Sequence, residues 1–197
     1  MSAVDNVSMG ASEPLRERLV GAGVDMLEEV GAAQLGLRAI TRAAGVSHGA
    51  PRRHFPTHRA LLAAIAARGF ADLIERFAQA AAGTTTPREQ LQVMAAEYVE
   101  FAGERPEMFT LMFRHDLLEG SGAELRSTSL PLFGSLVALV EEATAGSADA
   151  RERALGIWTG LHGMAVLAAD RALQVIGDPQ GAGALVGRTV DAHLAHG

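Results

Sequence analysis

The segment ITRAAGVSHGAPRRHF, residues 40–55, decides the fold of this chain. Within it, Gly45 can adopt the left-handed backbone that turns a chain sharply, and Ser47 can start a helix by accepting a backbone N–H. Apolar spacing predicts one short helix over 38–44 and a second over about 47–54. Two short helices joined by a tight turn form a helix-turn-helix. The second helix would be roughly 12 Å long, which suits the major groove of DNA.

This segment lies in a basic window of an acidic chain. No Asp or Glu occurs between Glu29 and Asp72, whereas six arginines do: Arg38, Arg42, Arg52, Arg53, Arg59 and Arg68. The other 11 of the 17 basic residues stand against all 23 acidic ones and bring the net charge to −6. A basic element on an acidic body is typical of proteins that bind nucleic acid, and a solvated basic face without a partner is the alternative.

Composition narrows the class of protein further. The chain has 197 residues, 48% hydrophobic content and no cysteine, which suits one or two domains without disulfides or thiolate metal sites. The N-terminus lacks a basic and then apolar run, so no signal peptide is expected. The longest uncharged run, 154–169, is too short to span a membrane. These features predict a cytoplasmic protein.

Neither a metal site nor catalysis is expected. His54 and His58 are four residues apart, but Phe55-Pro56 breaks the helix between them. No nucleophile motif, phosphate loop or pair of carboxylates suggests an enzyme, so neither cofactor nor catalytic residue is predicted.

Helical periodicity extends along nearly the whole chain, and no segment alternates as a strand does. The fold class is therefore predicted to be all-α. An N-terminal three-helix helix-turn-helix domain would be joined by a long helix to a C-terminal bundle. The expected domains are a disordered tail over 1–12, a DNA-binding domain over 13–60 and an effector-binding and dimerisation domain over 61–197. Helices are expected at about 14–30, 58–82, 87–103, from 106, and at 123–143, 148–176 and 180–196, in addition to the two short ones.

The residues AITRAAGVSHGAPRRHFPTHRALL, with the flanking helices, resemble the DNA-binding domain of TetR-type transcriptional repressors over roughly 14–75. The segment IWTGLHGMAVLAADRAL resembles the subset of these repressors with a Trp-x-x-x-His-Gly signature in the effector domain. Four residues depart from what is usual in the family, namely Thr41, Pro51, Arg52 and His58. The departures concern DNA contacts and leave the predicted fold unchanged.

By position, the resemblance implies two sets of DNA-binding residues. One set faces the DNA and comprises His48, Gly49, Arg52, Arg53 and His54. The other lies near the DNA backbone and comprises Arg38, Thr41, Arg42, Ser47, Thr57 and His58. Arginine binds a guanine edge or a phosphate, and helix starts donate N–H groups to phosphates. Which arginine reads a base stays open, and packing or capping is the alternative role for His54.

The C-terminal half gathers methionine and aromatic residues. Most are expected in the core, but polar tips among them are typical of a small-molecule site. The expected ligand-binding residues are Tyr98, Phe101, Met112, Phe113, Trp158 and His162. Trp158 and His162 share a helix face, and simple stacking is an alternative explanation for that pair.

The helix expected over 148–176 is apolar on more than one face, and Gly156, Gly160 and Gly163 permit close helix approach. One face needs a partner, and the family resemblance implies that the last two helices pair across a twofold axis. The predicted protein is a homodimeric repressor that binds palindromic double-stranded operator DNA and is released by a small apolar or amphipathic effector. A helical carrier or interaction module without DNA binding is the alternative.

Overall fold

The computed structural model describes residues 12–46, 51–114, 126–176 and 179–195. The described residues contain helices and no strand, which confirms the all-α fold class. The predicted tail lies outside the described residues up to residue 11, as do residues 47–50 of the helix predicted over 47–54. The helices are α1 (Ser12–Gln34), α2 (Leu37–Ala43), α3 (Pro51–His54), α4 (His58–Ala81), α5 (Pro87–Glu104), α6 (Pro106–Phe113), α8 (Arg126–Ala143), α9 (Ala150–Ala169), α10 (Leu173–Ile176) and α11 (Pro179–Leu194).

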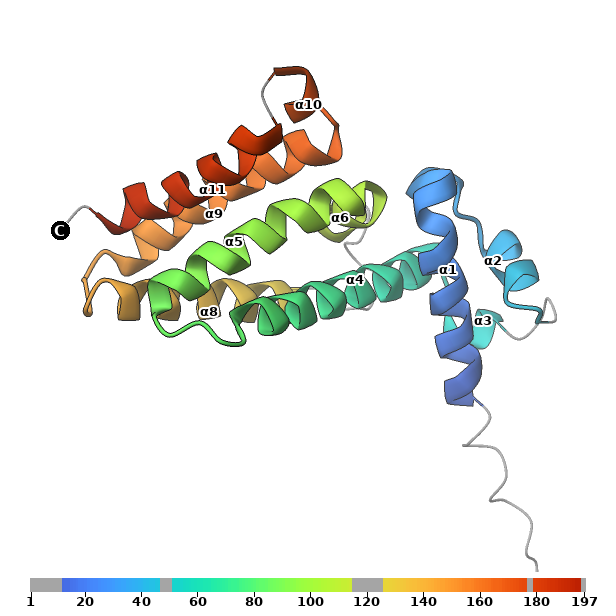
Figure 1. Cartoon of the computed structure of the whole chain (residues 1–197). Coiled ribbons are helices and arrows are strands. Elements are labelled where there is room, and N and C mark those ends of the chain that lie inside the picture. The colour runs from blue at the N-terminus through green and yellow to red at the C-terminus, as the bar shows by residue number, and fades with distance from the viewer. Residues whose placement is uncertain (1–11, 47–50, 115–125, 177–178, 196–197) are drawn as a thin grey trace, which may run out of the picture.

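The helices form two groups that α4 connects. α1, α2 and α3 lie at one end of α4, and α5, α8, α9 and α11 lie side by side toward its other end (Figure 1). α4 packs against α1 as well as against α5 and α6. Its core residues run along its whole length, from Leu61 and Ile65, which are fully buried, to Leu73 and Phe77. One continuous helix therefore belongs to both hydrophobic regions.

Helix starts follow their local sequence. The hydroxyl of Thr57 accepts a hydrogen bond from Ala60 N at 3.1 Å and so caps α4. Thr86 and Glu89 form a reciprocal capping box at the start of α5. Hydrogen bonds from the Thr85 backbone and hydroxyl, and then from Thr86, lower the pKa of the Glu89 carboxyl. The sequence within a few residues of each start therefore determines where α4 and α5 begin.

Helix α1 is interrupted at Gly31, directly after residue 30, where the sequence predicts that this helix ends. Gly31 has φ 70° and ψ 157°, and helical residues resume after it as far as Gln34. A Cβ at Gly31 would lie 3.1 Å from an oxygen of Glu107 on α6, so this position is close to the C-terminal bundle. The bend is therefore both a helix interruption and a contact point between the two groups of helices.

The single long helix predicted over 148–176 is wrong, because α9 ends at Ala169. Arg171 adopts a left-handed φ of 57°. Arg171 N donates to Ala168 O at 3.0 Å and Ala172 N to Leu167 O at 2.9 Å, the bond pattern of a Schellman ending. Sequence reasoning missed this ending because a non-glycine residue adopts the left-handed conformation and the apolar periodicity continues past it.

The glycines of α9 do permit close approach, but to a helix of the same chain. A Cβ at Gly160 would lie 2.9 Å from the Thr189 methyl carbon on α11, and the ring of His193 lies against Gly156. A Cβ at Gly163 would meet no neighbouring atom within 4 Å. Close packing of α9 on α11 thus accounts for two of the three glycines. Among the described residues, no helix is long and apolar enough to cross a membrane.

Candidate functional site

The turn between α2 and α3 is built by local hydrogen bonds. Gly45 has φ 64°, and its N donates to Arg42 O at 3.1 Å, while Val46 N donates to Thr41 O at 3.1 Å. This pair of bonds is a Schellman ending, in which glycine supplies the left-handed residue without a Cβ penalty. The predicted role of Gly45 is confirmed. The turn sends the chain away from α2 toward the short helix α3.

Side chains from neighbouring helices hold this turn in place. Arg18 on α1 donates to Ala44 O at 2.5 Å. His58, at the start of α4, is hydrogen-bonded through Nε2 to Leu35 O at 2.6 Å, just before α2. Phe55 is buried beneath the guanidinium of Arg16, whose central carbon lies 5.6 Å from the ring centroid. The helix-turn-helix is therefore anchored to both α1 and α4.

Four arginines of this unit face solvent. Arg38 and Arg42 on α2 and Arg52 and Arg53 on α3 are all exposed. Among the ion pairs of the described residues, none involves these four. Farther along the chain, carboxylate partners occur for Arg68, Arg76, Arg88, Arg105 and Arg153 but, among the described residues, not for Arg151, Arg171 or Arg188. The helix-turn-helix thus presents uncompensated positive charge.

The other predicted DNA-binding residues are in varied positions. Thr41 is 2% exposed and its hydroxyl donates to Leu37 O at 2.6 Å, so this side chain packs inside the domain and does not face outward. His58 is exposed, but its ring is held by Leu35 O. Thr57 is exposed at the start of α4, and His54 is half-buried. The predicted Ser47, His48 and Gly49 lie outside the described residues.

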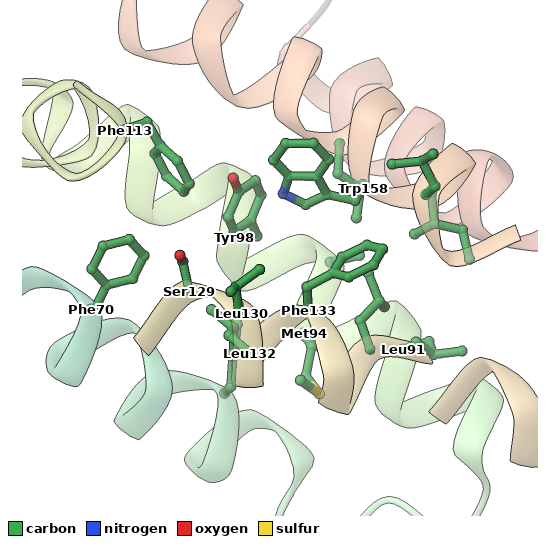
Figure 2. A pocket seen from close by; sticks show the side chains of 16 residues that line it. Phe70, Leu91, Met94, Tyr98, Phe113, Ser129, Leu130, Leu132, Phe133 and Trp158 are labelled. Atoms are coloured by element: carbon green, nitrogen blue, oxygen red, sulfur yellow. The ribbon is translucent and has the colours of Figure 1, made fainter. Parts of the chain in front are cut away.

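A cavity of about 520 Å³ lies within the C-terminal group of helices. Phe70 and Phe113 gather at one end with Tyr98 and Ser129, and Leu91 lies toward the other end (Figure 2). The lining comes from α4, α5, α6, α8 and α9, and consists of Phe70, Phe77, Leu91, Met94, Ala95, Tyr98, Phe113, Ser129, Leu130, Leu132, Phe133, Leu136, Leu155, Ile157, Trp158 and Leu161. None of these described lining residues carries a charge. The volume falls within the range of small-molecule sites.

One polar cluster adjoins the cavity. The Tyr98 hydroxyl lies within hydrogen-bond distance of His162 Nδ1, at 2.8 Å. Burial raises the pKa of Tyr98 well above its usual value and lowers the pKa of His162 below 6.5, because both charged forms lose hydration. The indole of Trp158 stacks on His162 with ring centroids 5.3 Å apart. Tyr98 and His162 are therefore neutral at pH 7, and all three groups are joined by ring contacts or hydrogen bonds.

Three of the six predicted ligand-binding residues line the cavity, namely Tyr98, Phe113 and Trp158. His162 contacts all three without lining it. Phe101 and Met112 lie elsewhere: Phe101 packs beneath Arg76 and Arg105, and Met112 packs against Gly69. Sequence reasoning missed the lining residues of α4 and α8, because apolar residues at helical spacing have the same pattern around a cavity as in a filled core.

The cavity and the helix-turn-helix are joined by direct contacts. Helix α6 carries Phe113 to the cavity, and the Glu28 carboxylate on α1 accepts hydrogen bonds from Glu107 N at 3.1 Å and Met108 N at 3.0 Å at the start of α6. Arg105, just before α6, forms an ion pair with Asp72 on α4 at 2.9 Å. α6 is thus bound to both α1 and α4. No group of three metal-binding side chains occurs among the described residues.

Two family models match this chain. Residues 19–65 match the model of bacterial regulatory proteins of the tetR family, and residues 91–193 match the tetracyclin repressor-like C-terminal domain. No sequence among curated proteins matches it. The two matched ranges cover the helix-turn-helix and the helices that enclose most of the cavity.

Solved structures also resemble the chain over nearly its whole length. A protein of unknown function from Rhodococcus sp. RHA1 is 30% identical, with a TM-score of 0.78 over 99% of this chain and 98% of that one. A TetR-like regulator from the same organism is 19% identical, with a TM-score of 0.70 over 98% and 100%. A tetR-family regulator from Streptomyces coelicolor is 20% identical, with a TM-score of 0.70 over 95% and 81%. The last two show a shared fold. The C-terminal family model matches more than half of the residues of this chain. The chain therefore belongs to the TetR family of transcriptional regulators, whose members are not enzymes.

Proposed function

We propose that this regulator is a repressor that binds a palindromic operator as a homodimer and is released by a small ligand in the helical cavity. The observation that carries the DNA-binding part is the set of four exposed arginines on α2 and α3 without carboxylate partners among the described residues. Phosphates of DNA would supply the missing negative charge, and release of their counterions would drive binding.

The proposed DNA contacts divide into two groups. Arg52, Arg53 and His54 face the major groove, together with His48 and Gly49 of the stretch outside the described residues. Arg38 and Arg42 contact phosphates, with Ser47 and with the N-terminal backbone of α4 after Thr57. His58 supports this group through its bond to Leu35 O, whereas Thr41 is left out because its hydroxyl is bonded inside α2.

The proposed route from ligand to DNA follows α4 and α6. Phe70 and Phe77 of α4 line the cavity, and the same helix packs on α1 at its other end. The first turn of α6 is bonded to Glu28 of α1. A ligand that moves α4 or α6 would therefore reorient the helix-turn-helix, and it releases DNA only by its differential affinity for the two orientations. On this proposal the DNA-binding domain spans 13–60 and the effector domain 61–197.

Exposed apolar residues support the proposed homodimer. Val166 and Leu167 on α9 are 40% and 39% exposed, and Leu185 on α11 is 42% exposed. Pairing α9 and α11 with their twofold mates would bury these side chains. The two recognition helices would then read half-sites about one helical turn or somewhat more apart, so the operator would be a near palindrome.

A second candidate function is a helical small-molecule carrier, and the uncharged cavity itself favours it. Selection of bound sequences from a random DNA pool, followed by a retardation assay, distinguishes the two. The regulator should select a near palindrome and lose affinity steeply with salt, whereas a carrier should select nothing.

Substitutions test the placement of the DNA-binding surface. Arg52→Ala and Arg53→Ala should each weaken operator binding, and the arginine that contacts a phosphate should lower the salt slope by about one unit. Arg88→Ala is the matched control, because Arg88 is also exposed but is paired with Asp191 in the C-terminal bundle. Unchanged binding by both α3 variants would refute the surface.

A further inference from the structure

The chemistry of the cavity restricts the ligand that it accepts. A cavity of about 520 Å³ would hold roughly 17 water-sized groups at about 30 Å³ each. Its walls are mostly apolar, so water inside would find few hydrogen-bond partners and an apolar molecule would displace it favourably. This volume suits a molecule of roughly 10–15 non-hydrogen atoms, because a ligand does not fill its cavity completely.

The described lining residues offer no counter-ion for a charged ligand. Every described lining residue is apolar apart from Tyr98, Ser129 and Trp158, and these three are uncharged. His162, behind this lining, has a pKa lowered by burial and is neutral at pH 7. A carboxylate or an ammonium group would lose its hydration here without gaining a partner of opposite charge, and that loss outweighs the burial of a short apolar chain.

Polar atoms gather at one end of the cavity. There Tyr98 and Ser129 lie with Phe70 and Phe113, while Leu91 lies toward the other end (Figure 2). The ligand must therefore be polar at one end only, because a second polar group would lie among apolar side chains without a partner.

The hydrogen bond of Tyr98 defines which polar group fits. The Tyr98 hydroxyl lies 2.8 Å from Nδ1 of the His162 ring. We take the neutral tautomer of His162 that carries its proton on Nε2, so that the Tyr98 hydroxyl donates to Nδ1. This arrangement uses the Tyr98 proton but leaves its oxygen free to accept from a ligand, whereas the Ser129 hydroxyl can either donate or accept. A group that both donates and accepts matches the two.

We propose that the effector is an uncharged molecule with a single terminal hydroxyl and an apolar body of about ten carbon atoms, held with its hydroxyl between Tyr98 and Ser129. The regulatory consequence rests on the proposed function, but the binding itself does not. The apolar body lies along α4, α5 and α8 toward Leu91. A ketone of the same length makes only the bond from Ser129.

The test is a titration of the full chain followed by the emission of Trp158, which lines the cavity and is the single tryptophan of the sequence. The probes are 1-decanol, 2-undecanone, decanoate and decylammonium, each below its aggregation concentration at pH 7.5. Decanol should bind most tightly, the ketone roughly three- to tenfold more weakly, and both ions at least about 100-fold more weakly.

Two variants locate the hydroxyl. Ser129→Ala should weaken decanol binding roughly three- to tenfold, and Tyr98→Phe should do the same while the preference for decanol over the ketone is lost. Ser135→Ala is the control, because Ser135 lies on α8 but is exposed and does not line the cavity. Should Tyr98→Phe fail to fold, Ser129→Ala still decides the placement.

Three results would overturn the proposal: tight binding of either ion, no binding of any probe, or equal affinities in the Ser129→Ala and Ser135→Ala variants. A parallel measurement of operator retardation separates this failure from that of the proposed function. Decanol that binds without releasing DNA would support the ligand class and contradict ligand-released repression.

Discussion

Removing the Glu28 carboxylate should weaken the docking of α1 on α6. Its two oxygens accept from Glu107 N at 3.1 Å and Met108 N at 3.0 Å, so a side chain from 79 residues earlier in the sequence caps the start of α6. Pro106 at the first position of α6 has no N–H, which leaves these two N–H groups as the main donors of the first turn. The perturbation is Glu28→Ala, with Glu28→Gln as the variant that keeps an oxygen acceptor without its charge.

The expected magnitude follows from the exposure of the two bonds. Met108 is fully buried, so its N–H would lose a partner that water replaces poorly, whereas the Glu107 N–H is exposed and water can replace its bond. Loss of a helix cap costs about 0.5–2 kcal/mol, and loss of an acid near a helix N-terminus costs about 0.3–1 kcal/mol. Because part of this loss is recovered by solvent, Glu28→Ala should lower the free energy of unfolding by about 1–2 kcal/mol. Glu28→Gln should cost about half of that.

The assay is urea unfolding at a fixed protein concentration, since an oligomer has a concentration-dependent stability. Glu29→Ala is the matched control, because Glu29 is the exposed neighbour on α1 and makes no hydrogen bond or ion pair among the described residues. A thermal melt should show Glu28→Ala lower by about 2–8 °C. If the Glu28 and Glu29 variants agree within about 0.3 kcal/mol, the cap contributes nothing and the reasoning is refuted.

Three further predictions concern packing, pH and assembly. Gly69→Ala should destabilise the chain by about 1–3 kcal/mol in urea unfolding, because the new Cβ would lie 2.5 Å from the sulfur of Met108. An unchanged urea midpoint would show that α6 can shift to accommodate the Cβ without cost. The free energy of unfolding should fall as the pH drops from 7 through 6.5 toward the lower pKa of His162 in the folded chain, because the unfolded ring takes up its proton first. His162→Phe should flatten this part of the pH profile of stability. A variant profile that runs parallel to that of the unaltered chain would contradict the prediction. Val166→Asp should convert a dimer to a monomer in light scattering, whereas Ile74→Asp on α4 should not. Ile74 is the matched control, because its exposed fraction of 42% is similar to the 40% of Val166. If both variants gave the same result, the interface would not lie on α9.

Several features of the candidate site could be predicted because their causes are local. Gly45 ends α2 through bonds to residues within five positions, and Thr57 caps α4 through a bond to Ala60. The excess of arginine over acid between Glu29 and Asp72 is a property of composition and survives any folding. Backbone preference, capping and charge can therefore be predicted from the sequence without knowledge of any long-range contact.

Other features depended on contacts between distant segments. Thr41 resembles a phosphate-contacting residue in sequence, yet in the fold its hydroxyl is bonded to Leu37 O and its side chain is buried. Phe101 and Met112 share the apolar spacing of Phe113, but only Phe113 lines the cavity. Periodicity says which face of a helix is apolar, and it does not say whether that face meets a neighbouring side chain or a void.

By itself, the sequence determined the all-α class, the helix-turn-helix and the basic character of the N-terminal region, because helix formation, tight turns and local charge depend on neighbours within a few residues. Only the tertiary structure decided which helices enclose the cavity and that Glu28 caps α6 from the other group of helices. These outcomes depend on how helices meet in three dimensions, and an exposed glutamate on α1 has no local pattern that distinguishes a long-range cap from a solvated side chain.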